Sequence, residues 1–477
     1  MTGEAKPSTK LGGRYWRLWA ASVTSNLGDG IAAIAYPWLA SAVTRNPLLI
    51  ALVAVAQRLP WLVFTLPAGV ITDRVDRRKL MVAMDVARFA VTIFVAGAVL
   101  ANESRLPTPE VLASGVDVAT NLAVYLVLVF AALLLGFAEV LRDNSAQTIL
   151  PALVEPDQLE KANGNLWGAE MVMNSFVGPP VGSALLAVGF ALPFFVDGGT
   201  FFVAAALVFL IAGQYRAQGE AADKPKEIAW RAEISEGFRW LWHHPVLRPL
   251  AIILGFLNGL GMMLFATFVL FAQENLDLET GLFTGVLGDL GDSLGFESIG
   301  ALTFALLMMS GALGGVIGAA FASRISKRLG SGPSLWVTIV GGAVTSLIIG
   351  LASRWWVVFL AFAVGTVTAV LWNVITVSLR QTIIPDPLLG RVNSVYRFFG
   401  WGMMPIGSAL GGAIVAVGEP IVGRSAALRL PYFFVTIVYL LLMIYAAPRL
   451  TTEKMEEARA GGAAAKAGGA DGSDEGN

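Results

Sequence analysis

The chain has 477 residues, of which 56% are hydrophobic and only 14% are charged, and its formal net charge at pH 7 is −1. A soluble domain carries about 25% charged residues, so this composition excludes a soluble globular protein, and the near-neutral charge gives no reason to expect nucleic acid as a partner. The chain has no cysteine, which excludes disulfides, iron–sulfur clusters and thiol nucleophiles.

Nearly uncharged stretches recur along the whole chain, and each is long enough to cross a bilayer as a helix. The apolar residues run continuously instead of alternating, which disfavours a membrane β-barrel. We therefore expect an all-α integral membrane protein with about twelve transmembrane helices. The predicted spans are residues 16–40, 48–68, 80–100, 120–141, 163–187, 190–212, 247–272, 298–322, 334–352, 355–379, 391–417 and 430–448.

The distribution of basic residues orients these spans. The start of the chain, MTGEAKPSTKLGGRYWRLW, lacks the early apolar core and cleavage site of a signal peptide, so we expect the first span to remain as an anchor. Most Lys and Arg residues lie in the loops on the same side as the N-terminus, and the positive-inside rule makes this side cytoplasmic. The prediction is a multi-pass protein of the plasma membrane with both termini in the cytoplasm.

Short sequences occur twice, in the same order in each half of the chain. The pairs are QTILP (147–151) and QTIIP (381–385), GPPVGSAL (178–185) and MPIGSAL (404–410), and the looser GVITDRVDRRK and AAFASRISKR. Duplication predicts two six-helix halves related by pseudo-symmetry, at residues 16–212 and 247–448. Parallel repeats of this kind are typical of alternating-access transporters.

The remaining segments are polar. Residues 1–15 form the N-terminal tail, and residues 213–246 form a cytoplasmic linker between the halves. Within the linker, Trp230, Phe238 and Trp242 recur near helical spacing, which predicts an amphipathic helix lying on the membrane surface. Residues 449–477 are rich in glycine, alanine and charge, and we expect them to be disordered.

Two motifs resemble signatures of the major facilitator superfamily. GVITDRVDRRK is similar to the signature of the loop between its second and third helices, and VGPPVGS is similar to the antiporter motif of its fifth helix. SNLGDG, ALVEPDQLEKANG and LLGRVNSVYR resemble the branch that contains the enterobactin exporter and macrolide efflux proteins. The resemblance covers about 430 residues and implies the major facilitator fold and a transport function.

In the first motif, Gly69 would allow close helix packing. The resemblance implies that Asp73 meets the N-terminus of the eleventh helix, where a carboxylate is favourable, and latches the cytoplasmic side shut. Arg74, Arg77 and Arg78 would add salt bridges. The alternative is an ordinary basic loop on the cytoplasmic side.

In the second motif, Pro179 and Pro180 remove backbone donors and should bend the fifth helix, while Gly178 and Gly182 permit close packing. Such a bend can gate a pathway between the halves. Asn174 stands where the family pattern has its leading glycine, so antiport is supported without being settled. Packing alone is the other explanation.

Ionisable residues inside a membrane are costly and indicate function. Asp29 and Glu170 lie near the middle of their predicted spans, and we expect them to couple transport to protons. Arg58 and Arg397 would be counter-charges or substrate contacts. The further candidates are Glu139, Asn26 and Asn174.

Structural roles are the alternative for the same residues. Asp29 and Arg58 could form a buried ion pair between adjacent helices, and Asp85 and Arg88 are spaced to pair on one helical face. The asparagines could equally hydrogen-bond between helices.

The sequence predicts a secondary active transporter that exports an amphipathic small molecule, such as a drug, siderophore or secondary metabolite, in exchange for protons. The alternatives are an uptake carrier or lipid-flipping transporter of the same fold and, last, a ligand sensor that transports nothing. The sequence contains no phosphate-binding loop, HExxH or Gly-x-Ser-x-Gly motif, so we expect no enzyme activity, cofactor or metal site. The expected partners are the substrate, protons and the lipid bilayer, and the expected functional unit is a monomer.

Overall fold

The computed structural model describes residues 11–107, 112, 119–155, 158–215, 230–278, 285–286, 288–289 and 299–471. Each predicted span falls largely on helical residues, and the second and fifth spans are divided among several helices. This confirms the all-α membrane fold. Among the described residues, ten helices are long and apolar enough to cross a bilayer. The helix of the first span is less apolar because residues such as Asn26 and Asp29 interrupt it, and that of the second span, Pro47–Val63, is apolar but shorter.

The N-terminal half contains the helices of the first six spans. They are α1 (Gly13–Val43), α2 (Pro47–Val63), α3 (Thr65–Arg74), α4 (Arg77–Asn102), α6 (Leu122–Ile149), α7 (Leu159–Met171), the π-helical segment η4 (Val172–Val177), α8 (Gly178–Val188) and α9 (Leu192–Phe209). The C-terminal half contains α11 (Leu247–Asn275), α13 (Ile299–Leu329), α14 (Ser331–Leu351), α15 (Trp355–Ile383), α16 (Asp386–Val422), the short α17 (Arg424–Ala427) and α18 (Leu430–Ala446).

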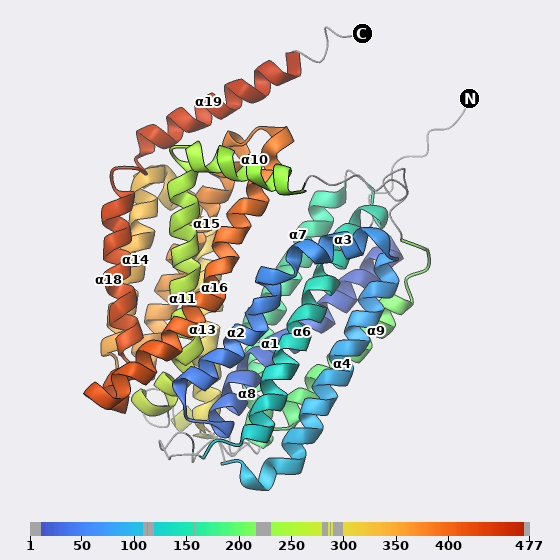
Figure 1. The fold of residues 1–477 in the computed structure, drawn as a ribbon, viewed down its shortest axis with the longest axis vertical. Coiled ribbons are helices and arrows are strands. Elements are labelled where there is room, and N and C mark those ends of the chain that lie inside the picture. Colours follow the sequence, from blue (N-terminus) through green and yellow to red (C-terminus); the bar gives the residue numbers. More distant parts are fainter. Residues whose placement is uncertain are drawn as a thin grey trace.

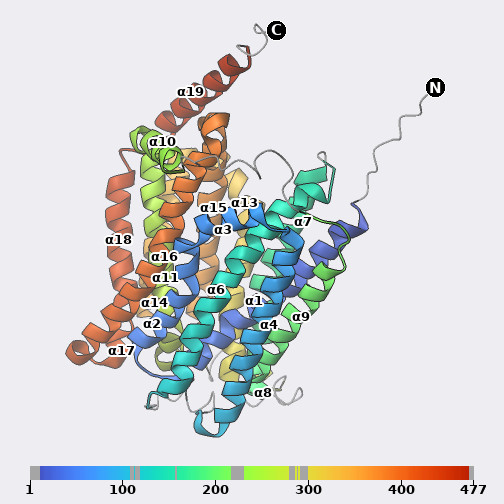
Figure 2. The same cartoon turned by 45° about the vertical axis from the view of Figure 1, so that its right-hand side comes forward.

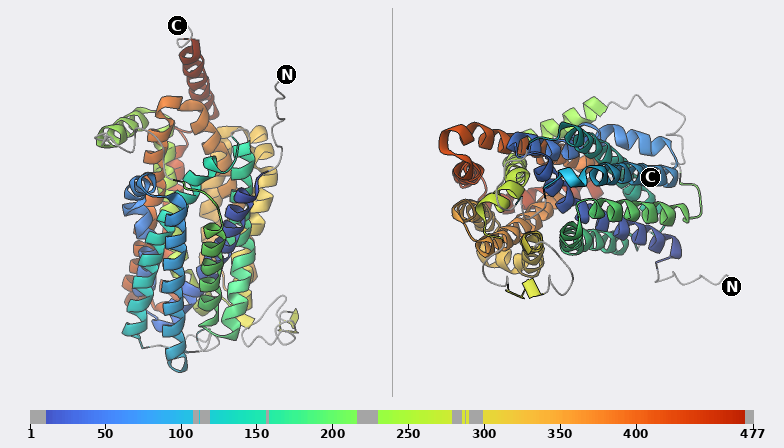
Figure 3. Two further views of the ribbon diagram at one scale, coloured as in Figure 1. Left: turned by 90° about the vertical axis from the view of Figure 1, so that its right-hand side faces the viewer. Right: turned by 90° about the horizontal axis from the view of Figure 1, so that it is seen from below.

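The two halves lie side by side (Figure 1, and Figure 3, right). We call the end that holds the start of α1 and the last helix, α19, the termini end, and the opposite end the distal end. The ribbons of the halves lie together at the distal end and diverge toward the termini end, where α3 and α7 stand apart from α10 and α16 (Figures 1 and 2). The two halves therefore pack against each other mainly at the distal end.

Local sequence explains where several helices begin and end. Asn46 caps α2 by accepting hydrogen bonds from the backbone N–H groups of Leu48 and Leu49, and Asp76 caps α4 in the same way through Lys79. Such caps satisfy backbone donors that have no partner within the helix. The second predicted span is divided at Phe64 into α2 and α3.

The segment before Pro179 and Pro180 changes its hydrogen-bond pattern. Residues Val172–Val177 form a π-helical turn between α7 and α8. Proline lacks a backbone N–H and leaves a carbonyl of the preceding turn without its usual partner. π-Helical turns occur mostly within α-helices and are frequent at functional sites. The predicted irregularity of the fifth helix therefore takes the form of a π-helical turn ahead of the prolines.

The linker contributes α10 (Trp230–His243), in the segment predicted to be amphipathic. Leu241 is buried, whereas Phe238 and Trp242 remain exposed and stack with Phe399 of α16. Arg391 of α16 donates to Glu236 of α10 at 2.5 Å. This helix therefore packs on α16 while presenting aromatic side chains outward, and its position on the membrane surface stays a prediction.

The prediction of a disordered C-terminal tail is wrong for Thr452–Asp471, which form α19. Alanine, glutamate and lysine are strong helix formers and offset the glycines. Met455 is fully buried, and a Cβ atom placed on Gly462 would lie 2.6 Å from the Cα atom of Ile383 in α15. The helix is therefore held by close packing against α15 of the C-terminal half.

Candidate functional site

A buried ion network joins α1, α4 and α6. Arg88 of α4 pairs with Asp29 of α1, and its Nη1 atom donates to the Oγ atom of Ser25 at 3.0 Å. The same Nη1 atom lies 3.8 Å from Oδ1 of Asp85, which in turn lies 3.6 Å from Nε of Arg142 in α6. The Asp85 and Arg88 side chains are 0% and 3% exposed, so these charges are held deep within the half.

The partner of Asp29 is therefore Arg88 and not Arg58, the alternative that the sequence suggested. Arg58 lies on α2 and is exposed. The expected pairing of Asp85 with Arg88 one turn apart is present at 3.8 Å. Arg88 also lies over the ring of Phe201 in α9, with Cζ 3.8 Å from the ring centre. It is therefore held by two neighbouring helices, α1 and α9, together with α4 itself.

Further carboxylates surround this network. Asp143 lies 3.5 Å from Nη1 of Arg142. Glu139 is partly buried and interacts electrostatically with Asp29, Arg58 and Asp143. Glu170 is exposed at the end of α7 and interacts with Asp143 and Asp29. The cluster combines Asp29, Asp85, Glu139, Asp143 and Glu170 with Arg58, Arg88 and Arg142. The cluster contains more carboxylates than guanidinium groups, so binding or release of protons can change its net charge.

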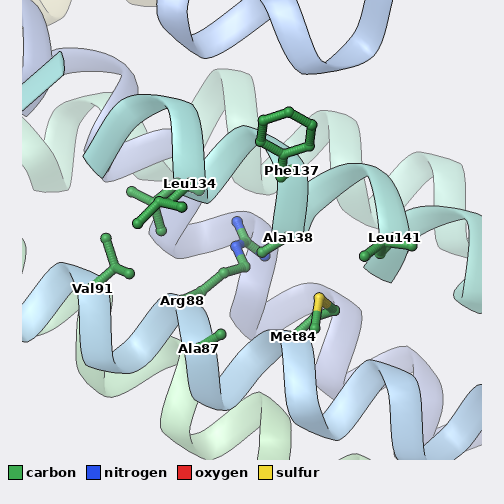
Figure 4. A pocket seen from close by; sticks show the side chains of 9 residues that line it. Met84, Ala87, Arg88, Val91, Leu134, Phe137, Ala138 and Leu141 are labelled. Carbon is green, nitrogen blue, oxygen red and sulfur yellow. The ribbon is translucent and has the colours of Figure 1, made fainter. Parts of the chain in front are cut away.

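A small cavity of about 220 Å³ lies between α4 and α6 beside Arg88. Figure 4 shows its apolar lining, including Met84, Val91, Leu134 and Phe137, with the Arg88 side chain reaching across from α4. The apolar lining limits the solvation of the guanidinium group, and ionic partners consequently interact with it more strongly than they would in water.

The antiporter-like motif packs directly against α1 next to Asp29. A Cβ atom on Gly178 would lie 2.5 Å from the Cα atom of Gly30, and one on Gly182 would lie 2.8 Å from the carbonyl oxygen of Ile31. Asn174 donates to the Oδ1 atom of Asn26 at 3.0 Å. The two candidate asparagines therefore bond to each other between α1 and the π-helical turn, and any movement of that turn acts on the segment that holds Asp29.

The basic residues of the first motif contact carbonyl groups of their own half. Arg77 donates to the carbonyl oxygen of Thr148 at 3.0 Å, and Arg78 donates to that of Ile211 at 2.7 Å. These carbonyls lie at the C-terminal ends of α6 and α9, where cations are favourable. Arg74 is exposed. The side chains of Asp73 and Arg397, and the surroundings of Gly69, lie outside the described residues, so the predicted latch on α16 stays a prediction.

A polar cluster that the sequence analysis did not single out connects the halves at the distal end. Arg45, between α1 and α2, pairs with Glu274 of α11 and donates to Gln273 at 2.8 Å. Arg424 of α17 donates to Glu274 at 2.7 Å and to the carbonyl oxygen of Arg45 at 2.8 Å. We call Arg45, Gln273, Glu274 and Arg424 the distal latch. Arg45 is 5% exposed and Glu274 9%, so this ion pair between the halves is largely shielded from water.

Asp197 of α9 is a second residue that the sequence analysis missed. It is 1% exposed, and its Oδ1 atom has no hydrogen-bond partner among the described residues. A signal was available in the sequence, because Asp197 is the sole charged residue of the predicted span 190–212.

Comparisons with known proteins agree with this architecture. The family model described as Major Facilitator Superfamily matches residues 18–400. The chain is 29% identical over 444 residues to the multidrug efflux pump Tap of Mycolicibacterium fortuitum, covering 91% of this chain and 97% of that protein. It is 25% identical over 381 residues to the enterobactin exporter EntS of Citrobacter koseri, covering 79% of this chain and 78% of that protein.

Solved structures show the same fold. The nucleoside transporter NupG aligns with a TM-score of 0.62 at 10% identity, covering 92% of this chain and 99% of that one. A bacterial homologue of the iron transporter ferroportin in an inward-facing state aligns with a TM-score of 0.59 at 14% identity, covering 91% of this chain and 99% of that one. At these identities the likeness concerns the fold alone.

Proposed function

The chain belongs to the Major Facilitator Superfamily and is a transporter, and we propose that it exports an amphipathic small molecule in exchange for protons by alternating access. The observation that carries the proposal is the Asp29–Arg88 pair, in which a partly exposed carboxylate meets a buried guanidinium group in the interior of the membrane. Protonation of Asp29 would remove the charge that attracts Arg88, so proton binding would alter the contact between α1 and α4.

Asp29 is suited to respond to both a proton and a substrate. Its side chain is 29% exposed, whereas that of Arg88 is 3% exposed. A carboxylate that is partly open on one side and ion-paired on the other can bind a proton from solution and then release its partner. The neighbouring contact between Gly30 and Gly178 would transmit the change to the fifth helix.

An amphipathic substrate fits the exposed residues around Glu170. Trp167 is 64% exposed, one helical turn from Glu170, and Met171 is 37% exposed. A carboxylate beside an accessible indole ring favours a cationic compound with an apolar body. The names of the relatives Tap, a multidrug efflux pump, and EntS, an enterobactin exporter, support export over the alternatives of uptake and lipid flipping.

The arrangement of the halves fits an inward-facing state. The distal latch closes one end, and the ribbons diverge at the other (Figure 1). With the termini end in the cytoplasm, as the positive-inside rule indicates, substrate would enter from the cytoplasm and leave at the distal end after the latch opens. The plasma membrane is the proposed location.

The experiment is a flux measurement on purified protein in liposomes. Ethidium, a cationic amphipath, and the siderophore enterobactin serve as probes while a pH gradient is imposed, with the pH of the vesicle interior followed by a trapped dye. We expect one of the probes to move against its own gradient, accompanied by opposite proton movement. Movement unaffected by the pH gradient would contradict proton coupling, and saturable binding of a probe without any movement would indicate a sensor.

A further inference from the structure

Asp197 lies next to the Asp29–Arg88 pair but belongs to a different helix. A Cβ atom placed on Gly28 of α1 would lie 2.3 Å from the Oδ1 atom of Asp197. The carboxyl group of α9 therefore touches the backbone of α1 immediately before Asp29, and the contact requires glycine at this position.

Arg88 of α4 lies against the face of α9 that carries Asp197. Its guanidinium group is centred 3.8 Å from the ring of Phe201, which is one helical turn from Asp197. Asp197 interacts electrostatically with Asp29 of α1 and with Arg88 of α4. It also interacts electrostatically with Tyr36 of α1. Arg88 thus interacts with acids of two helices, α1 and α9, and it pairs with the one on α1, Asp29.

The surroundings of Asp197 do not suit an ionised carboxylate. Among the described residues no ion pair includes it, and its Oδ1 atom has no hydrogen-bond donor. Burial of an unpaired ion in an apolar medium is far more costly than burial of a neutral acid. A neutral carboxyl group therefore suits this position better than a carboxylate while Arg88 is paired with Asp29.

The hydroxyl groups of Tyr36 and Thr92 are also buried without a hydrogen-bond partner in the described part of the chain. Tyr36 is two helical turns beyond Asp29 in the distal direction, and Thr92 is one turn beyond Arg88 in the same direction. These two hydroxyl groups lie between the ion pair and the distal end, whereas the Asp197 carboxyl group lies against Gly28, beside Asp29 itself.

We propose that Asp197 is a proton-binding residue of the transport cycle and exchanges its proton with Asp29. In this step the O–H bond of the Asp197 carboxyl group breaks, and an O–H bond forms on the Asp29 carboxylate. Arg88 then loses its charged partner on α1 and is attracted to the new carboxylate on α9. The inference rests on the proposed proton antiport and supplies it with a second proton site, on α9 beside the Asp29–Arg88 pair.

The first test is infrared spectroscopy of the purified protein at neutral pH, and it requires no substrate. The wild type should show a carbonyl band of a protonated carboxyl group, and Asp197→Asn should lose one component of that band. Asp277→Asn serves as the control, because Asp277 is an exposed acid paired with Arg354, and it should leave the band unchanged. A spectrum of Asp197→Asn identical to that of the wild type would overturn the proposal. Asparagine resembles the neutral acid in shape, so this variant should fold with nearly unchanged thermal stability.

The second test separates the inference from the function on which it rests. Ethidium-coupled proton movement is compared with the exchange of labelled for unlabelled ethidium at equal pH on both sides. Asp197→Asn should reduce coupled proton movement by about tenfold or more while exchange stays within about twofold of the wild type. Undiminished coupling in the variant overturns the role of Asp197. If the wild type itself moves no protons with ethidium, the proposed antiport is contradicted, while the infrared result still decides whether Asp197 is protonated.

Discussion

Arg45, in the connection between α1 and α2, pairs with Glu274 at the end of α11, and so joins the two halves at the distal end. Arg424 holds the same carboxylate from α17. All three groups are charged and form a contact that is largely closed to solvent, so opening this end requires the ion pairs to separate and become hydrated together.

Removal of one partner should therefore favour opening of the distal end. Breaking a buried ion pair costs about 3–5 kcal/mol, and Glu274→Gln should raise the population of the distally open state. The chain has no native cysteine, so spin labels can be placed at Leu122→Cys and Ile421→Cys, two exposed distal positions in different halves. The distance distribution between the labels should shift to longer values.

A matched control is Arg354→Ala, which removes an exposed ion pair with Asp277 within the C-terminal half. This variant should leave the distribution unchanged, since exposed pairs contribute about 0–1 kcal/mol. Equal distributions in Glu274→Gln and the wild type would show that the latch does not hold the distal end.

The contact between Gly178 and Gly30 should tolerate no side chain. Alanine at position 178 would place its Cβ atom 2.5 Å from the Cα atom of Gly30, and overpacking of this kind costs about 1–3 kcal/mol. We expect Gly178→Ala to lower the thermal unfolding temperature and to impair transport. Gly164→Ala in α7, where a Cβ atom meets nothing within 4 Å, should be neutral. Equal stability of the two variants would refute the close contact.

Arg88 and Asp29 should be energetically coupled. Arg88→Met leaves Asp29 and Asp85 without their shared cation, a change that costs about 3–5 kcal/mol for a buried pair. Asp29→Asn removes one of these orphaned charges, so the double variant should lose less stability than the sum of the two single variants. A double-mutant cycle of thermal stability measures this difference, and strict additivity would mean that the pair contributes nothing.

His244 should make stability depend on pH. Its Nδ1 atom accepts hydrogen bonds from the backbone N–H groups of Val246 and Leu247 at 3.2 Å, at the start of α11. Burial lowers the pKa of His244 below the usual value of 6.5, so the unfolded chain binds this proton more readily than the folded one. The stability that this group contributes is therefore complete above pH 6.5 and decreases as the pH falls below it.

His244→Asn tests this dependence, because asparagine can cap a helix without titrating. The unfolding temperature of the wild type should decrease between pH 7 and pH 5 more steeply than that of the variant. The other histidine, His243, is exposed, and His243→Asn should retain the wild-type profile. A parallel decline in all three proteins would assign the pH dependence to other groups.

The sequence predicted an all-α membrane fold in two halves because long apolar stretches and internal repeats are local features. It predicted about twelve spans, whereas ten of the described helices are long and apolar enough to cross a bilayer. It also predicted the pairing of Asp85 with Arg88, which one turn of helix determines. It did not predict the partner of Asp29, because the choice between Arg58 and Arg88 depends on how α1 is rotated and which helix lies beside it.

Other features depended on contacts that are distant in sequence. The α19 helix is stabilised by packing on α15, which the composition of the tail does not reveal. The distal latch joins the connection between α1 and α2 to the end of α11 and to α17, so its residues lie far apart along the chain. Asp197 was detectable as a lone acid in an apolar span, but only the approach of Gly28 and Arg88 shows why it matters.

The central claim is that proton binding at Asp29 drives transport, and the most direct measurement compares two modes of ethidium movement in liposomes. Two variants are measured beside the wild type: Asp29→Asn and, for the second candidate coupling residue, Glu170→Gln. Each is measured for ethidium movement driven by a pH gradient and for ethidium exchange without a gradient. The account predicts that Asp29→Asn loses gradient-driven movement and retains exchange. Normal gradient-driven movement in Asp29→Asn would contradict it.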